Sequence, residues 1–380
     1  MKHRNIFLIG IDVDSMGGSQ RVLHTLAQGF AGRGHRVELI GIRPSPEPHT
    51  YQPDPGYGHT TLYPEPAPEP WRANTFAERL NWSRIREQRA RSDHRDEALV
   101  KLKERLAAVD TGYLIIGSPW AADWLRAAEW PHLRGIGQYH ESYEQARASA
   151  NLRLILRHYP ELEKSVFLSE GDAALFRRDR LPNAATIPNP LPFSPGLAAR
   201  LDTRRIGAVG RLEPVKRLDR LIDAFADTAT RAPDWELHLF GDGPLRGTLE
   251  AHAASRGVAE RVHFRGSVQN MAAAYRELSL LALTSDREGR PMAVAEAAAC
   301  GVPTVSFDLS AGVRELIKDG HTGTLVPPGN THAFTQALTH LMTDTPRRHH
   351  YGAAARNHVA PLDLPRVLDR WETLFEEIDR

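Results

Sequence analysis

Two carboxylates, Glu288 and Glu296, stand eight positions apart in the segment Ser285–Asp308. Glu288 lies in a glycine- and proline-containing turn, and Glu296 lies in the alanine-rich stretch that follows. We expect that stretch to be a helix that starts at Pro291, where a missing N–H costs nothing, and ends just before Gly301. The start of such a helix offers free N–H groups to a phosphate. Carboxylates on either side of a phosphate can accept hydrogen bonds from hydroxyls, so the segment suits a nucleotide sugar.

Two cations, Arg211 and Lys216, stand just ahead of a second predicted helix, Leu218–Ala229. Positive side chains at the positive end of a helix dipole are unfavourable unless an anion lies among them. The pattern therefore indicates a second group of phosphate-binding residues.

These two segments resemble the donor site of the family-4 glycosyltransferases. The resemblance rests on Glu-Gly-x-Pro, the second glutamate and Ala-x-Gly-x-Pro-x-Val in the first segment, and on VGRLEPVKRLDRLIDAFA in the other. It implies that Glu288 contacts the transferred sugar and Glu296 the nucleotide ribose. The diphosphate would be held by Arg211, Lys216 and the turn Gly289, Arg290, Pro291 and Met292. Arg290 departs from the family, which more often has an apolar residue there.

The resemblance also implies roles for residues outside these segments. Gly17 and Gly18, which follow the first predicted strand, would approach the diphosphate and the reacting carbon. His140, at the end of another predicted strand, would approach the sugar, although a structural histidine is the alternative. Val268 lies in a turn that would contact the nucleotide base.

Bulk composition narrows the function classes. The chain has 380 residues, with 48 Lys and Arg against 47 Asp and Glu, so nothing favours nucleic acid as a partner. The single cysteine, Cys300, excludes an internal disulfide and fits a reducing compartment. Without a signal-like or membrane-spanning apolar run, we expect a cytoplasmic protein.

Strands and helices alternate twice along the chain, which predicts an α/β fold of two doubly wound parallel sheets. The first alternation gives a domain at 1–190, and the proline-rich run Ile187–Gly196 is the linker. The second gives a nucleotide-sugar-binding domain at 197–361, and a last helix at 362–380 would return to the first domain. Two Rossmann-like domains facing a cleft correspond to the GT-B architecture of the family.

Two stretches of the first half interrupt this alternation. Residues Pro44–Pro70, rich in proline and histidine, are expected to be a surface excursion rather than a helix. A charged helix is expected at about Arg79–Arg105. Its arginines could contact an anionic acceptor or lipid headgroups at the inner face of the membrane, but a solvated face is the preferred interpretation.

Metal chemistry is not expected. Asp12-Val13-Asp14 has the Asp-x-Asp form of a metal site in another glycosyltransferase architecture, but it precedes the first helix and has no companion ligand in the sequence. The 18 histidines show no zinc-type spacing with cysteine and are expected at the surface. A cationic clamp can replace a metal, so no metal or other cofactor is predicted.

The sequence thus predicts a retaining glycosyltransferase that moves a sugar from a nucleoside-diphosphate sugar, with a UDP-sugar preferred and GDP-mannose next. The acceptor would be a glycan, a lipid-linked glycan or a small molecule. Two alternatives stay open: a non-hydrolysing nucleotide-sugar epimerase, and a non-catalytic subunit that binds nucleotide sugar or glycan. A nicotinamide dehydrogenase is disfavoured because the first strand–helix turn lacks Gly-x-Gly-x-x-Gly.

Overall fold

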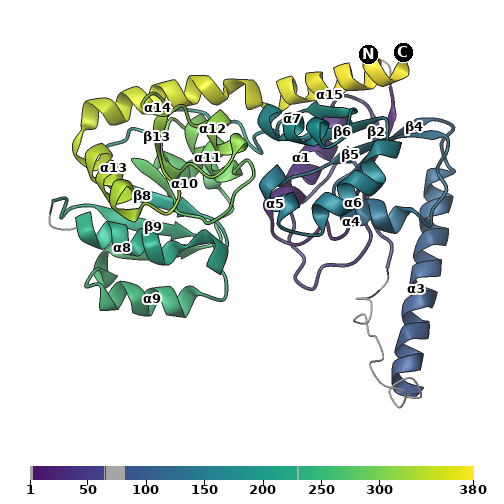
Figure 1. Ribbon diagram of the computed structural model, residues 1–380, viewed down its shortest axis with the longest axis horizontal. Helices are drawn as coiled ribbons and strands as arrows, with labels where there is room; N and C mark the ends of the chain where they lie inside the picture. The colour runs from purple at the N-terminus through teal and green to yellow at the C-terminus, as the bar shows by residue number, and fades with distance from the viewer. Residues whose placement is uncertain (1–2, 64, 66–81, 229–230) are drawn as a thin grey trace.

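The computed structural model describes residues 3–63, 65, 82–228 and 231–380 and contains two parallel β-sheets (Figure 1). The N-terminal sheet has the strand order β3-β2-β1-β4-β5-β6-β7. Its strands are β1 (Asn5–Gly10), β2 (Arg36–Gly41), β3 (Gly58–Thr61), β4 (Gly112–Ile116), β5 (Leu133–Gln138), β6 (Lys164–Phe167) and β7 (Ala184–Thr186). The C-terminal sheet has the order β10-β9-β8-β11-β12-β13. Its strands are β8 (Arg205–Val209), β9 (Glu236–Phe240), β10 (Val262–Gly266), β11 (Leu280–Leu283), β12 (Thr304–Phe307) and β13 (Gly323–Val326).

Helices connect the parallel strands. Those of the N-terminal half are α1 (Gly18–Gly32), α3 (Trp82–Leu106), α4 (Pro119–Leu125), α5 (Tyr143–Arg147), α6 (Asn151–His158) and α7 (Glu170–Arg178). Those of the second half are α8 (Leu218–Thr228), α9 (Arg246–Ser255), α10 (Met271–Arg276), α11 (Met292–Ala299), α12 (Ala311–Leu316), α13 (Thr331–Thr343), α14 (Thr345–Val359) and α15 (Leu364–Asp379). In Figure 1, α3 projects away from the N-terminal sheet. No described helix is both long enough and apolar enough to cross a lipid bilayer.

Both faces of the N-terminal sheet are buried, as the continuous apolar run of β1 predicts. Ile6 and Leu8 pack on one face with α1 and α15, whereas Phe7 and Ile9 pack on the other face with α3 to α7. This alternation follows from the two-residue period of a strand. The sheet is therefore a rigid support for the loops at its strand ends.

The chain passes between the two halves twice. The outgoing segment Ile187–Gly196 contains no helix or strand, and the backbone N–H of Leu191 donates to Leu362 O of the returning segment at 2.8 Å. The returning chain then forms α15, which packs against α1, while α14 covers the C-terminal domain (Figure 1).

The prediction of two Rossmann-like doubly wound domains is confirmed, but several local details differ. Three short strands, β3, β7 and β13, were not predicted. The helix expected from Pro291 begins at Met292, and Pro291 is its N-cap. Gly301 has φ +77° just past the helix end, as expected of a glycine that terminates a helix. The predicted charged helix is α3; Arg79 and the end of the Pro44–Pro70 excursion fall outside the described residues.

Each sheet has one point where the strand order changes direction, between β1 and β4 and between β8 and β11. Loops diverge at such a point and leave a crevice at the carboxyl ends of the strands, where open α/β sheets bind ligands. The Gly17-Gly18 turn follows β1, the cations follow β8, and Glu288 follows β11. The fold therefore places Gly17-Gly18, the two cations and Glu288 at the two switch points, whereas Val268 follows the edge strand β10 and His140 follows β5.

Candidate functional site

Lys216 and Glu288 form an ion pair at the switch point of the C-terminal sheet. Lys216 Nζ lies 2.7 Å from Glu288 Oε1, and the side chains are 26% and 10% exposed. Ser285 Oγ donates to the same carboxylate oxygen at 2.6 Å. The ammonium has three N–H donors and spends one on Glu288, so it can also serve an anion beside the carboxylate.

Two hydrogen bonds hold the loops that carry this pair. The Asp286 N–H donates to Val215 O at 2.8 Å, and the Thr284 hydroxyl donates to Lys216 O at 3.1 Å. The loops after β8 and β11 are therefore joined on both sides of the ion pair. Because β8 and β11 are neighbours in the sheet, residues 72 positions apart become adjacent.

Arg211 is not brought into this pair. Its Nη2 lies 2.8 Å from Glu213 Oε1, and its side chain is 63% exposed. A side chain this exposed can change rotamer at little cost, so Arg211 stands at the rim of the site rather than inside it.

Glu296 lies inside α11 and is buried, with 3% of its side chain exposed. Its Oε2 accepts a hydrogen bond from the Tyr275 hydroxyl at 3.0 Å. Its Oε1 lies 3.6 Å from Arg21 Nη1, which comes from α1 of the other domain. Burial raises the pKa of Glu296, and Arg21 and the Tyr275 hydroxyl oppose that rise. Sequence reasoning missed Arg21 and Tyr275, because neither belongs to a motif.

The turn Gly289–Met292 lies between the two domains. A Cβ on Gly289 would come within 2.9 Å of Glu141 Cα in the loop after β5, so only glycine permits this approach. Met292 is the first residue of α11, preceded by the N-cap Pro291. The helix start thus faces the loop that carries the next predicted residue, His140.

Arg290 does not behave as the other residues of the turn. Its side chain is 10% exposed, and its Nε lies 3.6 Å from Glu315 Oε2 of α12. Burial lowers the pKa of Arg290 to about 10, with Glu315 opposing the shift. The structure therefore directs this guanidinium toward α12, where it helps to fix the turn.

His140 follows β5, and both of its ring nitrogens are buried with no partner of hydrogen-bonding geometry among the described residues. Burial lowers the pKa of His140 to about 4, and Asn189 beside it acts in the opposite direction. The imidazole is therefore neutral at pH 7, which suits an uncharged contact to a sugar hydroxyl.

The glycine pair caps α1 next to the C-terminal domain. Gly17 is the N-cap, and its N–H donates to the Tyr51 hydroxyl at 2.7 Å; a Cβ on Gly18 would meet nothing within 4 Å. Just before this pair, Met16 Sδ accepts from Ser267 Oγ at 3.6 Å. Val268, the next residue of that loop, is half-buried against the core. The structure thus brings the predicted base-binding turn beside the start of α1.

The Asp12-x-Asp14 segment is used internally. Asp12 Oδ1 accepts the N–H groups of Asp14 and Ser15, and Asp14 Oδ1 lies 3.1 Å from His59 Nε2. Four histidines, His24, His35, His158 and His238, are buried, so the expectation that the histidines lie at the surface is wrong for them.

Comparisons with known proteins show what the chain is similar to. Residues 193–358 match the family model described as glycosyl transferases group 1. An exopolysaccharide phosphotransferase of Streptomyces coelicolor is 31% identical over 283 residues, which are 73% of this chain and 30% of that protein. A GDP-mannose-dependent alpha-(1-6)-phosphatidylinositol monomannoside mannosyltransferase of Mycolicibacterium smegmatis is 34% identical over 173 residues, 43% of each chain. The chain thus spans less than half the length of these two relatives.

Solved structures share the whole fold at low identity. S. aureus TarM, in complex with fondaparinux, alpha-GlcNAc-glycerol and UDP, has a TM-score of 0.79 and 13% identity over 98% of this chain and 99% of its own. Anabaena HepE, in complex with UDP and glucose, has a TM-score of 0.76 and 17% identity; the match covers 99% of this chain and 100% of HepE. The chain therefore has the two-domain GT-B fold of these structures, and residues 193–358 resemble the glycosyl transferases group 1 family.

Proposed function

We propose that the protein is a retaining, metal-independent glycosyltransferase that uses a nucleoside-diphosphate sugar. The observation that carries the proposal is the Lys216–Glu288 pair at the β8/β11 switch point. In this proposal Lys216 binds the diphosphate and Glu288 binds the sugar, next to the start of α11. One ligand with adjacent diphosphate and sugar groups satisfies both.

The proposed roles follow the charge that develops during transfer. When the bond from the sugar to the diphosphate breaks, Lys216, the N–H groups at the start of α11 and the exposed Arg211 stabilise the leaving phosphate. Preorganised donors of this kind contribute about 3–4 kcal/mol each to the transition state. Glu288 and the neutral His140 bind sugar hydroxyls, and Glu296 binds the ribose.

The acceptor hydroxyl attacks the sugar carbon on the face that the diphosphate leaves, so the configuration is retained. Its proton passes to an oxygen of the leaving phosphate, which balances the charges without a metal ion. The Gly17-Gly18 turn gives the reacting groups room, and the loop at Val268 contacts the base.

A UDP-sugar is the preferred donor in this proposal. The TarM and HepE complexes contain UDP, whereas the mannosyltransferase relative is named for GDP-mannose, which makes GDP-mannose the second choice. A glycan, a lipid-linked glycan or a small metabolite is proposed as the acceptor. Cytoplasmic location and peripheral membrane contact stay predictions.

The direct test incubates the protein, with EDTA present, with single UDP- and GDP-sugars and pools of acceptors. We expect release of nucleoside diphosphate only when an acceptor is added, with the anomeric configuration of the product, read by NMR, equal to that of the donor. Conversion of the sugar without an acceptor would instead show an epimerase. Tight donor binding without turnover would favour the non-catalytic subunit, and an inverted product would refute retention.

A further inference from the structure

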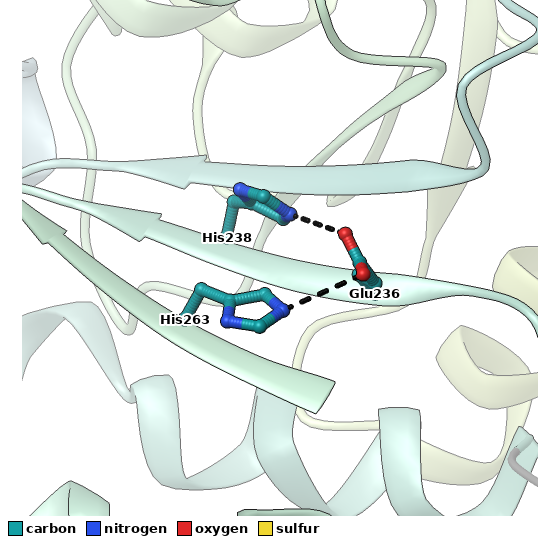
Figure 2. Close-up of side chains that lie close together, drawn as sticks. All are labelled: Glu236, His238 and His263. Carbon is teal, nitrogen blue, oxygen red and sulfur yellow. Dashed lines mark hydrogen bonds and ion pairs between the residues drawn. The ribbon is translucent and has the colours of Figure 1, made fainter. Parts of the chain in front are cut away.

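We propose that Glu236, His238 and His263 form a binding site for a divalent transition-metal ion of the zinc type, separate from the donor site. Figure 2 shows the three side chains converging from two neighbouring strands, β9 and β10. This proposal goes beyond the glycosyltransferase activity and does not depend on it.

The three ligand atoms are already close together. His238 Nε2 lies 3.0 Å from Glu236 Oε2, and His263 Nε2 lies 3.6 Å from Glu236 Oε1. One ligand atom from each residue lies within 4.8 Å of the other two. Around a tetrahedral zinc ion with bonds of about 2.1 Å, ligand atoms are separated by about 3.4 Å. Small side-chain rotations therefore suffice to bind an ion between them.

The parallel register explains why these residues meet. Glu236 and His238 are two positions apart on β9 and so share one face of the sheet. His263 is the direct partner of His238 on β10, and the two rings are 4.8 Å apart. Two imidazoles and one carboxylate match the ligand types of zinc sites that keep an open coordination position.

The cluster combines one buried side chain with two that solvent can reach. The His238 side chain is 6% exposed, whereas Glu236 and His263 are 40% and 36% exposed and give an ion access from solvent.

Arg205 is the cation that competes for this carboxylate. Its Nε lies 3.4 Å from Glu236 Oε2, and its Nη1 lies 3.2 Å from Glu277 Oε2. Because Arg205 has both partners, it can stay with Glu277 when a metal ion takes Glu236. A divalent ion held by two imidazoles offsets the weakening of one partly exposed ion pair.

The site lies away from the proposed chemistry. Glu236 begins β9, and the donor residues follow the carboxyl ends of the strands, about 16 Å further along the sheet. A metal ion here would join the edge strand β10 to β9. It would thereby fix the start of β10; the loop to Ser267 and Val268 leaves from the other end of this strand toward α1.

The test uses the full chain without an affinity tag, treated with EDTA and then titrated with ZnCl₂ by calorimetry. Co²⁺, whose visible absorption reports its coordination, serves as a second probe. We expect one tight site per chain, a higher thermal midpoint with Zn²⁺, and affinity at least about 100-fold weaker in His263→Ala and Glu236→Gln.

A matched control separates ligation from other effects of substitution. His252→Ala removes a partly exposed histidine of the same domain and should bind Zn²⁺ like the wild type. Absence of a stoichiometric site in the wild type would overturn the proposal. Equal affinity in His263→Ala and the wild type would overturn it too, because the ion would then lie elsewhere.

Discussion

At the residue scale, burial decides which charges the candidate site can use. Lys216 and Glu288 are partly exposed and form an ion pair. His140 is buried with neither ring nitrogen paired among the described residues, and burial lowers its pKa to about 4. The site therefore combines one ion pair with a neutral imidazole.

The shifted pKa of His140 predicts a pH-dependent stability. Because the folded pKa lies below the ordinary value of 6.5, the unfolded chain binds more protons between pH 6.5 and about 4. The free energy of unfolding should therefore decrease as the pH is lowered through that window, by at most about 3 kcal/mol. Chemical denaturation of His140→Gln across this range should show a smaller loss than the wild type. The exposed His349→Gln is the control, and equal pH dependence in all three proteins would contradict the assignment.

Motif spacing in the sequence predicts Lys216, Glu288 and Glu296 as donor-site residues. The two motifs that contain them follow β8 and β11, which meet at a switch point of the C-terminal sheet. Motif spacing does not predict Arg21 or Tyr275, since the partners of a buried carboxylate depend on how two domains and two helices meet. The same limit applies to Glu236, His238 and His263, which the register of two parallel strands brings together.

At the element scale, the turn before α11 depends on how closely the domains approach. Gly289 lies against the backbone of the loop after β5, and Ser310 Oγ donates to Gly289 O at 2.6 Å. A turn held on both sides can present the start of α11 in one orientation.

Gly289→Ala should therefore disturb the site more than the fold of its domain. The new Cβ would lie within 2.9 Å of Glu141 Cα, and backbone on both sides has to shift. Misplacement of about 1 Å can cost on the order of 100-fold in rate, so steady-state kinetics should show kcat/KM reduced by tenfold to hundredfold. Gly247→Ala in α9, where a Cβ meets nothing within 4 Å, is the control. Unchanged kinetics in Gly289→Ala would show that the close approach has no role.

The long apolar strands were predictable because a continuous apolar run needs burial on both faces. The strands β3, β7 and β13 could not be predicted in this way, because they are too short to show such a run. They are three or four residues long, and β3 reads Gly-His-Thr-Thr. Such strands form because a neighbouring strand offers a ladder, and that information is not local.

At the scale of the whole molecule, α15 ties the end of the chain to its beginning. Trp371 is fully buried and packs edge-on against Phe30 of α1, with ring centroids 6.3 Å apart. The sequence predicts this helix and its apolar stripe, and family resemblance implies where it packs. How the two domains face each other follows from side chains of both and could not be predicted from either alone.

Trp371→Ala should destabilise the N-terminal domain by about 3–5 kcal/mol, the usual cost of removing a buried aromatic side chain. Denaturant unfolding followed by circular dichroism measures this. Leu197→Ala, at a side chain 80% exposed in the linker region, should change stability by less than about 0.5 kcal/mol. A Trp371→Ala protein as stable as the wild type would show that α15 does not help to hold the domain.

The central claim is that Lys216 binds the diphosphate of a nucleotide at the β8/β11 switch point. Calorimetric titration with UDP tests it most directly, using the wild type, Lys216→Ala and the exposed control Lys318→Ala. We expect the wild type and the control to bind alike and Lys216→Ala to bind at least about tenfold more weakly, since a charge-assisted hydrogen bond is lost. Binding of UDP to Lys216→Ala with the affinity of the wild type would contradict the account.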